Sequence, residues 1–160
     1  MDTLYIVIPA YNESENIKRT IEEWCPVVEK HNGGGASRLV IINDGSRDDT
    51  YEIASAECET RPLLTVLTKP NGGHGSTVLY GYRYALENGA DYIFQTDSDG
   101  QTDPAEFEKF WQIREATTPF SETAQAAATA FPALSWKKCC ARCSGPISMY
   151  PCRMQMPRSV

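Results

Sequence analysis

"DYIFQTDSDGQTDP", residues 91–104, combines the end of an apolar run with a cluster of acidic and amide side chains. Its apolar start is followed within ten positions by Asp97, Asp99 and Asp103. A short apolar run bounded by turn residues predicts a buried strand. Residues two apart in an extended segment point the same way, so the carboxylates of Asp97 and Asp99 face one point. Two such charges repel each other unless a metal, a ligand or water lies between them. The stretch therefore predicts a strand that ends at a charged site.

The same unit of a strand and a helix recurs along the chain before this stretch. Apolar runs predict strands at residues 4–11, 38–46, 63–69 and 91–97. Helical spacing and end signals predict helices at residues 14–28, 48–59, 76–90 and 103–116. Continuous apolar strands that alternate with helices are typical of a mostly parallel sheet with helices on both faces. We therefore predict an α/β domain whose strands all end at one edge, where ligands bind.

Composition narrows the class of protein. The 160 residues are enough for one domain with a sizeable core. A net charge of −6 argues against nucleic acid as a partner, because phosphate binding needs clustered Lys and Arg. No run approaches 18 apolar residues, and the start "MDTLYIVIPAYNE" has no basic leader, so we expect neither a membrane span nor a signal peptide. We accordingly expect a cytoplasmic location and six reduced cysteines.

Polar loops at the predicted edge carry two candidate chemistries, each with a simpler alternative. Asp97 and Asp99 offer hard oxygen ligands for Mg²⁺ or Mn²⁺ shared with phosphates, or they form a solvated acidic turn. Asp44 in "INDGS" offers a carboxylate to a base or ribose, or it forms a common Asp–Gly turn.

The loop "PNGGHG", residues 70–75, presents successive backbone N–H groups that suit an anion. It lacks the GxGxxG and Walker spacings, so neither a dinucleotide fold nor a P-loop is supported. We interpret His74 as a loop or hydrogen-bonding residue rather than a metal ligand, because no second His or Cys stands near it in the sequence.

Three stretches taken together resemble family 2 glycosyltransferases. They are "VIPAYNESENI" at 7–17, "VIINDGSRDDT" at 40–50 and "NGGHGSTVLYGYRYALENGADYIFQTDSDGQTDP" at 71–104. The resemblance covers residues 4 to about 115, and the motifs keep the family's order and spacing. It implies an A-type glycosyltransferase fold, in which a Rossmann-like sheet binds a nucleotide-sugar donor with a divalent metal.

The resemblance also implies roles for particular residues. Asp44 would bind the base, most often uracil, while Asp97 would contact the ribose and metal region. Asp99 would ligate the metal through the diphosphate, and Gln101 would assist, as in members like dolichol-phosphate-mannose synthase. The remaining residues of the implied nucleotide pocket are Pro9, Tyr11 and Glu13.

The family implies a UDP- or GDP-sugar donor and an acceptor that is a lipid (polyprenyl) phosphate or a cell-envelope saccharide. A metal would neutralise the charge on the departing diphosphate. Two alternatives stay open. The first is a metal-dependent nucleotide-binding fragment without catalysis. The second is an enzyme that makes activated sugars, which would need a Gly-rich basic loop where "PAYNESEN" stands. An enzyme of either kind would lie in the cytoplasm, or at the inner face of the membrane as a peripheral protein.

Residues 116–160 differ from residues 1–115 in composition. The first 115 residues carry a net charge of −10, whereas the last 45 carry +4, four of the six cysteines and a single acid, Glu122. This segment shows no strand signal and no obvious general base for an acceptor hydroxyl. We therefore divide the chain into an incomplete nucleotide-sugar-binding domain, 1–115, and a tail of low order, 116–160. Cys140 and Cys143 form a C-x-x-C without a proper second pair for zinc.

A shifted reading frame is a further hypothesis for this segment, beside a zinc site and a disordered tail. Codons read from the third base of codon 116 permit "YDAVFGNRTGRGDGV", and the same shift further on permits "PDANAPF", which resemble the family's continuation. Such a chain would be marginally stable and inactive in transfer. It would also leave Phe107, Phe110 and Trp111 partly uncovered.

Overall fold

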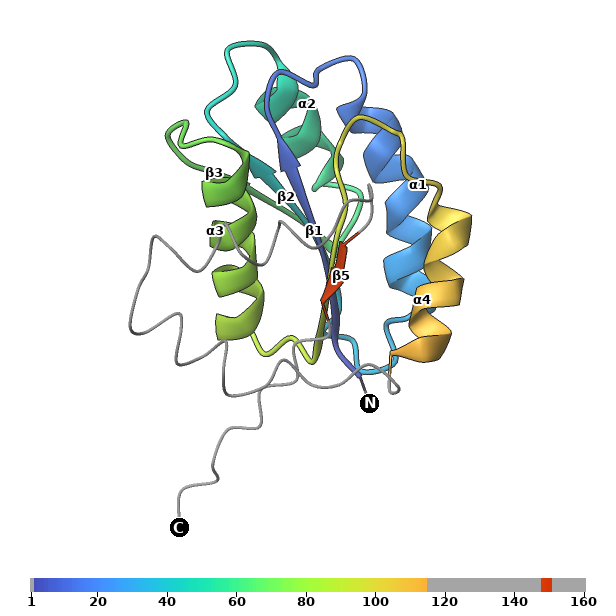
Figure 1. Cartoon of the computed structure of the whole chain (residues 1–160). Helices are drawn as coiled ribbons and strands as arrows, with labels where there is room; N and C mark the ends of the chain where they lie inside the picture. Colours follow the sequence, from blue (N-terminus) through green and yellow to red (C-terminus); the bar gives the residue numbers. More distant parts are fainter. Residues whose placement is uncertain (1, 115–147, 151–160) are drawn as a thin grey trace, which may run out of the picture.

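A computed structural model describes residues 2–114 and the backbone of residues 148–150 (Figure 1). The strands are β1 (Leu4–Ala10), β2 (Arg38–Asn43), β3 (Leu64–Thr68), β4 (Tyr92–Gln95) and β5 (Ser148–Tyr150). The helices are α1 (Ile17–Lys30), α2 (Thr50–Glu57), α3 (His74–Glu87), the 3₁₀ turn η1 (Pro104–Glu106) and α4 (Phe107–Ile113). Strands and helices alternate from β1 to α4, as the sequence predicts.

The five strands form one sheet in the order β3-β2-β1-β4-β5. The first four are parallel, with β1 paired to β2 on one side and to β4 on the other. Successive strands thus run outward from β1 to β3, and the chain then returns to the opposite side of β1 for β4. The prediction of a mostly parallel, Rossmann-like sheet is confirmed. The reversal of strand order lies between β1 and β4, which is where ligands bind in open sheets of this kind.

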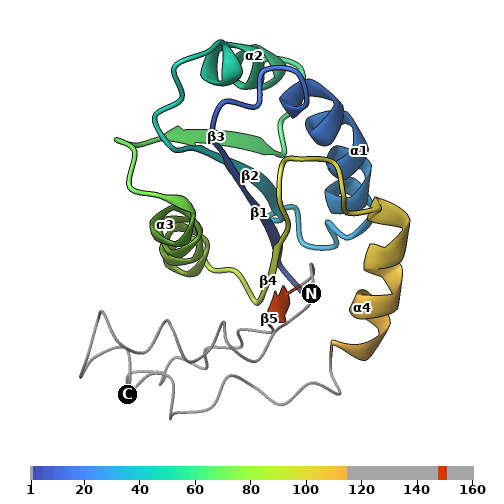
Figure 2. The ribbon, with the colours of Figure 1, turned by 45° about the horizontal axis from the view of Figure 1, so that its top comes forward.

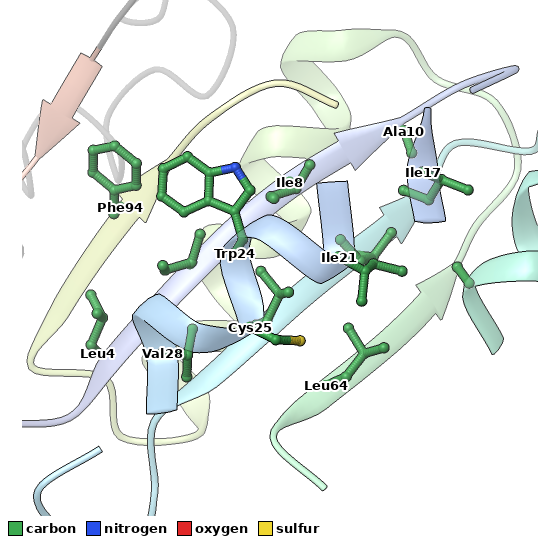
Figure 3. Close-up of a cluster of buried hydrophobic side chains, with 14 of the residues drawn as sticks. Leu4, Ile8, Ala10, Ile17, Ile21, Trp24, Cys25, Val28, Leu64 and Phe94 are labelled. Atoms are coloured by element: carbon green, nitrogen blue, oxygen red, sulfur yellow. The ribbon is translucent and has the colours of Figure 1, made fainter. Parts of the chain in front are cut away.

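Helices cover both faces of the sheet (Figure 2). Leu4, Ile6 and Ile8 pack with α1 in one apolar cluster, which α2 and α4 also cover (Figure 3). The alternate residues Tyr5 and Val7 belong to a second cluster, whose helical member is α3. Because successive side chains on a strand point to opposite faces, an uninterrupted apolar strand requires this two-sided cover.

Aromatic side chains join α4 to the sheet. Phe107 is only 2% exposed, and its ring centroid lies 5.0 Å from that of Phe94 and 6.3 Å from that of Trp24. Phe110 and Trp111 are partly buried against the same cluster. The expectation that Phe107 would lose its cover is therefore wrong, because β4 and α1 already bury it.

Several element boundaries differ from the predicted ones. The first helix is predicted from residue 14, but α1 begins at Ile17 after Asn16, which makes no side-chain capping hydrogen bond. The third helix begins at His74 rather than Ser76. The predicted start of the fourth helix at residue 103 agrees with the structure, where the Asp103 side chain accepts a hydrogen bond from the Ala105 N–H and Pro104 follows it.

The segment after α4 is described only at β5, which pairs antiparallel with β4. The expectation of no strand there is wrong at these three residues. The predicted boundary at residue 115, the C-x-x-C pair and the reading-frame hypothesis concern residues 115–147 and 151–160, outside the described part. Within the described part, no helix is long and apolar enough to cross a membrane.

The close approach of α3 to the sheet depends on Gly81. A Cβ atom at Gly81 would overlap Val7 Cγ1 and Ile42 Cδ1, both on buried side chains. Overpacking a well-filled interior forces side chains or backbone to shift.

We therefore expect Gly81→Ala to lower the free energy of unfolding by about 1–3 kcal/mol. This is the reverse of the gain of about 1 kcal/mol that Ala brings at an open helical position. Urea-induced unfolding followed by circular dichroism measures the change. The control is Tyr80→Ala, one position away on the exposed side of α3. A Gly81→Ala variant as stable as the wild type would show that α3 does not pack this closely.

Candidate functional site

A cleft of about 430 Å³ opens beyond the carboxyl ends of the strands. The loops after β1, β2, β3 and β4 gather at this end, at the top of Figure 1. Six residues singled out from the sequence line the cleft: Pro9, Tyr11, Glu13, Asp44, Asp97 and Asp99. The seventh, Gln101, is exposed and does not line it. The topology thus brings together side chains that are up to 90 positions apart in the sequence.

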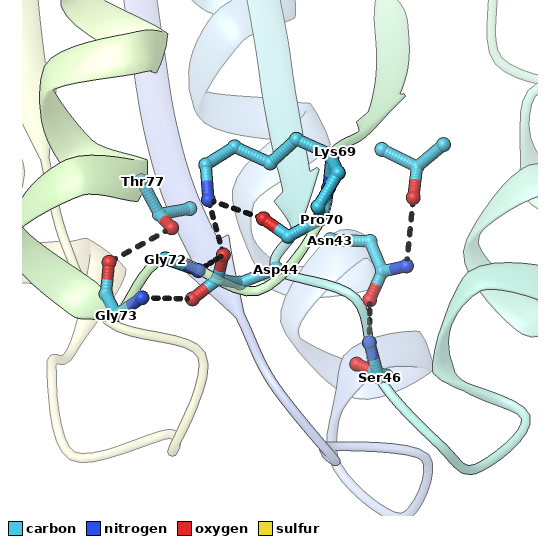
Figure 4. Close-up of polar contacts among 9 residues, drawn as sticks. Asn43, Asp44, Ser46, Lys69, Pro70, Gly72, Gly73 and Thr77 are labelled. Carbon is cyan, nitrogen blue, oxygen red and sulfur yellow. Dashed lines mark hydrogen bonds and ion pairs between the residues drawn. The ribbon is translucent and has the colours of Figure 1, made fainter.

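Asp44 lies at the base of this cleft and is only 3% exposed. Its Oδ1 accepts hydrogen bonds from Lys69 Nζ and from the Gly72 N–H at 2.9 Å, and its Oδ2 accepts one from the Gly73 N–H at 2.9 Å (Figure 4). Burial alone would raise the pKa of Asp44, but hydrogen bonds from Lys69, Gly72 and Thr77 outweigh it and hold the pKa below its usual value. Asp44 is therefore an ionised, internally compensated carboxylate.

This arrangement changes what the loop "PNGGHG" can offer. The N–H groups of Gly72 and Gly73, which the sequence suggested for an external anion, donate to Asp44 instead. Sequence reasoning also missed Lys69 as the partner of Asp44. The contact follows from the register of the sheet, in which Asn43 pairs with Thr68 and the two charged residues directly follow them, and no local sequence pattern reveals it.

The loops after β1 and β2 are bonded to each other, which fixes Tyr11 and Glu13 at the cleft. The Asn12 N–H donates to Ser46 Oγ at 3.0 Å, and the Glu13 N–H donates to Thr50 Oγ1 at 2.8 Å. Asn12 has a φ of +55°, which an Asn tolerates better than most residues. Tyr11 and Glu13, in the loop after β1, are thus positioned by the loop after β2 and by the first residue of α2.

Asp48 completes this link between the two loops. Its carboxylate accepts hydrogen bonds from the Ser14 N–H at 3.1 Å, the Thr50 N–H at 3.2 Å and the Thr50 hydroxyl. Burial raises the pKa of Asp48, but these hydrogen bonds from Thr50 and Ser14 prevail and lower it to about 2.

The loop after β4 holds Asp97 and Asp99 on the cleft side. Ser98 between them is buried, and its carbonyl oxygen accepts a hydrogen bond from Thr20 Oγ1 of α1 at 3.1 Å. The recorded polar contacts of the two carboxylates use Oδ1: Gln95 Nε2 donates to Asp97 at 3.0 Å, and the Gln101 N–H donates to Asp99 at 3.0 Å. Asp97 and Asp99 both line the cleft. The shared orientation of their carboxylates toward one space stays a prediction.

These two carboxylates fit a metal that is shared with a ligand. Within the part of the chain that the structure describes, no group of three or more His, Cys, Asp or Glu side chains could hold a metal by itself. Mg²⁺ is commonly held by one or two carboxylates together with substrate phosphates and water, and Mn²⁺ prefers similar oxygen ligands. Two cleft-facing carboxylates with one uncommitted oxygen each meet that requirement.

A parallel sheet with an acidic cleft at its point of strand reversal is the arrangement of an A-type glycosyltransferase domain that binds a nucleotide-sugar. The sequence profile of Glycosyl transferase family 2 matches residues 5–119. The chain belongs to this family.

Curated relatives have related names but are longer. The dolichyl-phosphate beta-glucosyltransferase ALG5C of Trichomonas vaginalis is 33% identical over 117 residues, which cover 70% of this chain and 34% of that protein. The UDP-N-acetylglucosamine--dolichyl-phosphate N-acetylglucosaminyltransferase of Methanococcus voltae is 30% identical over 123 residues, covering 68% of this chain and 46% of that protein. The chain thus spans less than half the length of these relatives.

Solved structures share the fold. The glucosyl-3-phosphoglycerate synthase of Mycobacterium tuberculosis, in complex with Mn²⁺, uridine diphosphate and glucosyl-3-phosphoglycerate, superposes with a TM-score of 0.52. It is 25% identical, and the match covers 73% of this chain and 40% of that one. The A-type, Rossmann-like fold predicted for the first 115 residues is therefore confirmed.

The lowered pKa of Asp48 predicts a pH dependence of stability. A carboxyl whose pKa falls from 3.8 to about 2 on folding stabilises the protein above the unfolded pKa, and this contribution is lost as the pH falls through the folded pKa. We expect Asp48→Asn to lower the free energy of unfolding by about 1–2 kcal/mol at pH 7. The difference from the wild type should shrink between about pH 4 and pH 2.

Urea unfolding at a series of pH values measures this difference. The matched control is Asp49→Asn, at the neighbouring exposed position, where no side-chain capping bond is made. A deficit of Asp48→Asn that is constant from pH 7 to pH 2 would contradict the assignment.

Proposed function

We propose that this domain binds a nucleoside diphosphate-sugar with Mg²⁺ or Mn²⁺, and that the complete protein transfers the sugar to a polyprenyl phosphate. The observation that carries the proposal is the convergence of Asp97 and Asp99 with Pro9, Tyr11 and Glu13 on one cleft at the strand reversal. Membership of family 2 supports the reaction type. The names of both curated relatives include dolichyl phosphate, which supports the acceptor class.

The proposed donor lies across the ends of β1 and β4. Pro9, Tyr11 and Glu13 would line the nucleoside, and Asp44 would lie beneath the base, where its carboxylate keeps the loop before α3 in place. Asp97 and Asp99 would hold the metal together with the diphosphate; Gln101 is not needed in this set, because its side chain lies outside the cleft. The bound metal supplies positive charge that stabilises the leaving diphosphate.

The described acids also bear on the choice of acceptor. In this proposal Asp97 and Asp99 are committed to the metal and Glu13 to the nucleoside, while Asp44 is compensated by Lys69. A saccharide hydroxyl needs a general base, whereas a phosphate monoester, with a second pKa of about 6, is already an anionic nucleophile at neutral pH. This difference favours a lipid phosphate over a saccharide. A uridine diphosphate donor is supported by the ligand named for the solved glucosyl-3-phosphoglycerate synthase structure.

A second candidate function is metal-dependent nucleotide binding without transfer. The observation that favours it is that the match to this chain covers only 34% and 46% of the two relatives' lengths. The two candidates differ in turnover but not in donor binding. Incubation with UDP-sugars and a polyprenyl phosphate, with release of UDP as the readout, separates them. The cytoplasmic location, with contact at the inner membrane face, stays a prediction.

The metal site is tested by calorimetric titration of UDP with and without Mn²⁺. We expect the wild type to bind UDP only when Mn²⁺ is present. Asp97→Asn and Asp99→Asn should each weaken the Mn²⁺-dependent affinity by at least about tenfold, because each removes a ligand charge from the metal. Asp49→Asn removes the same charge at an exposed position outside the cleft lining and should bind like the wild type. Equal UDP affinity with and without Mn²⁺ would contradict the proposed site.

A further inference from the structure

We propose that His74 donates a hydrogen bond to the diphosphate of the donor. This inference rests on the proposed function and adds one residue to its binding site. The sequence alone led us to interpret His74 as a loop or hydrogen-bonding residue, whereas the structure makes it the first residue of α3 and part of the cleft lining.

The position of His74 places it opposite the proposed metal ligands. Its Nε2 lies 3.8 Å from Asp97 Oδ1, which is beyond hydrogen-bond distance, and its side chain is 62% exposed. The imidazole and the Asp97 carboxylate therefore lie beside the same space and form no hydrogen bond across it. A phosphate oxygen held by a metal at Asp97 would lie within reach of the imidazole.

The charges of the side chains that line the cleft indicate which chemical group of a ligand binds in that space. Among the described residues, Glu13, Asp97 and Asp99 form no ion pair with a Lys or Arg, and the Lys69 ammonium lies against Asp44. His74 is the only basic side chain among the described residues that line the cleft. A diphosphate placed there needs donors beside the metal, since anions in proteins are held by charge-assisted or backbone N–H hydrogen bonds.

Two backbone donors of the neighbouring loop are already engaged. The N–H groups of Gly72 and Gly73 are both used by Asp44. Among the described residues that line the cleft, the His74 imidazole is then the basic side chain that can donate to the proposed diphosphate.

The backbone around His74 is held firmly, although the side chain is exposed. The Gly73 carbonyl oxygen accepts hydrogen bonds from the Thr77 N–H and from Thr77 Oγ1, both at 3.1 Å, while the Gly73 N–H donates to Asp44. The Cα of His74 is thus fixed by its neighbours and not by its own imidazole. Replacing the side chain should leave the fold intact, so a loss of binding can be assigned to the imidazole.

The test compares UDP with uridine, both in the presence of Mn²⁺, by NMR titration. We expect His74→Ala to weaken UDP binding by about 10- to 100-fold, the range for one hydrogen bond to a charged group, and to leave uridine binding unchanged. His74→Gln places an amide N–H at a similar reach and should recover part of the UDP affinity. The control is Arg83→Ala, which removes an exposed positive charge from the same helix outside the cleft lining. It should bind both compounds like the wild type.

The outcomes separate this inference from the proposed function. A wild type that binds no UDP with Mn²⁺ overturns both. A wild type that binds UDP, with His74→Ala binding UDP equally well, overturns the role of His74 alone. An equal loss of UDP and uridine affinity in His74→Ala also overturns it, because the side chain would then act on the shape of the cleft and not on the diphosphate.

Discussion

Burial of β1 on both faces is the constraint on which the rest of the structure depends. All seven residues from Leu4 to Ala10 are buried, and β1 pairs with β2 on one side and with β4 on the other. A strand of this kind is stable only when helices cover both faces, which α1 and α3 do. The central position of β1 also sets where strand order reverses. The location of the cleft therefore follows from the apolar packing and pairing of β1 and does not depend on the polar residues that line it.

Asp44 is the second constraint, and it acts on the polar end of the sheet. A buried carboxylate is strongly destabilising unless its charge is compensated and its oxygens are hydrogen-bonded. Lys69 supplies the charge, and the N–H groups of Gly72 and Gly73 supply hydrogen bonds. The requirement to satisfy one carboxylate thus determines the conformation of the loop between β3 and α3. It also engages the N–H groups of Gly72 and Gly73, which are then not available to a ligand.

The sequence predicted those features that depend on local periodicity. The strands, their order along the chain and the place of Asp97 and Asp99 directly after β4 follow from patterns within ten residues. The ion pair of Asp44 with Lys69 was missed because it depends on the register between β2 and β3, which is a property of two distant segments. The start of α3 at His74 was missed because its cap is the Gly73 backbone and not a side chain that the sequence would reveal. β5 depends on pairing with β4 rather than on an apolar run of its own.

The distribution of charge around the cleft indicates which half of a transfer reaction the described residues serve. In the proposed reaction, negative charge increases on the diphosphate as the sugar departs, and the carboxylates at the ends of β1 and β4 can tolerate it only with a cation between them. In this proposal the paired carboxylates and the imidazole of His74 would act on the leaving group, while Pro9, Tyr11 and Glu13 would line the nucleoside. Nothing in the described lining is suited to deprotonating an acceptor, apart from carboxylates already assigned to the donor. An acceptor that arrives already ionised needs no such base, and an anionic lipid phosphate meets that condition by its own chemistry.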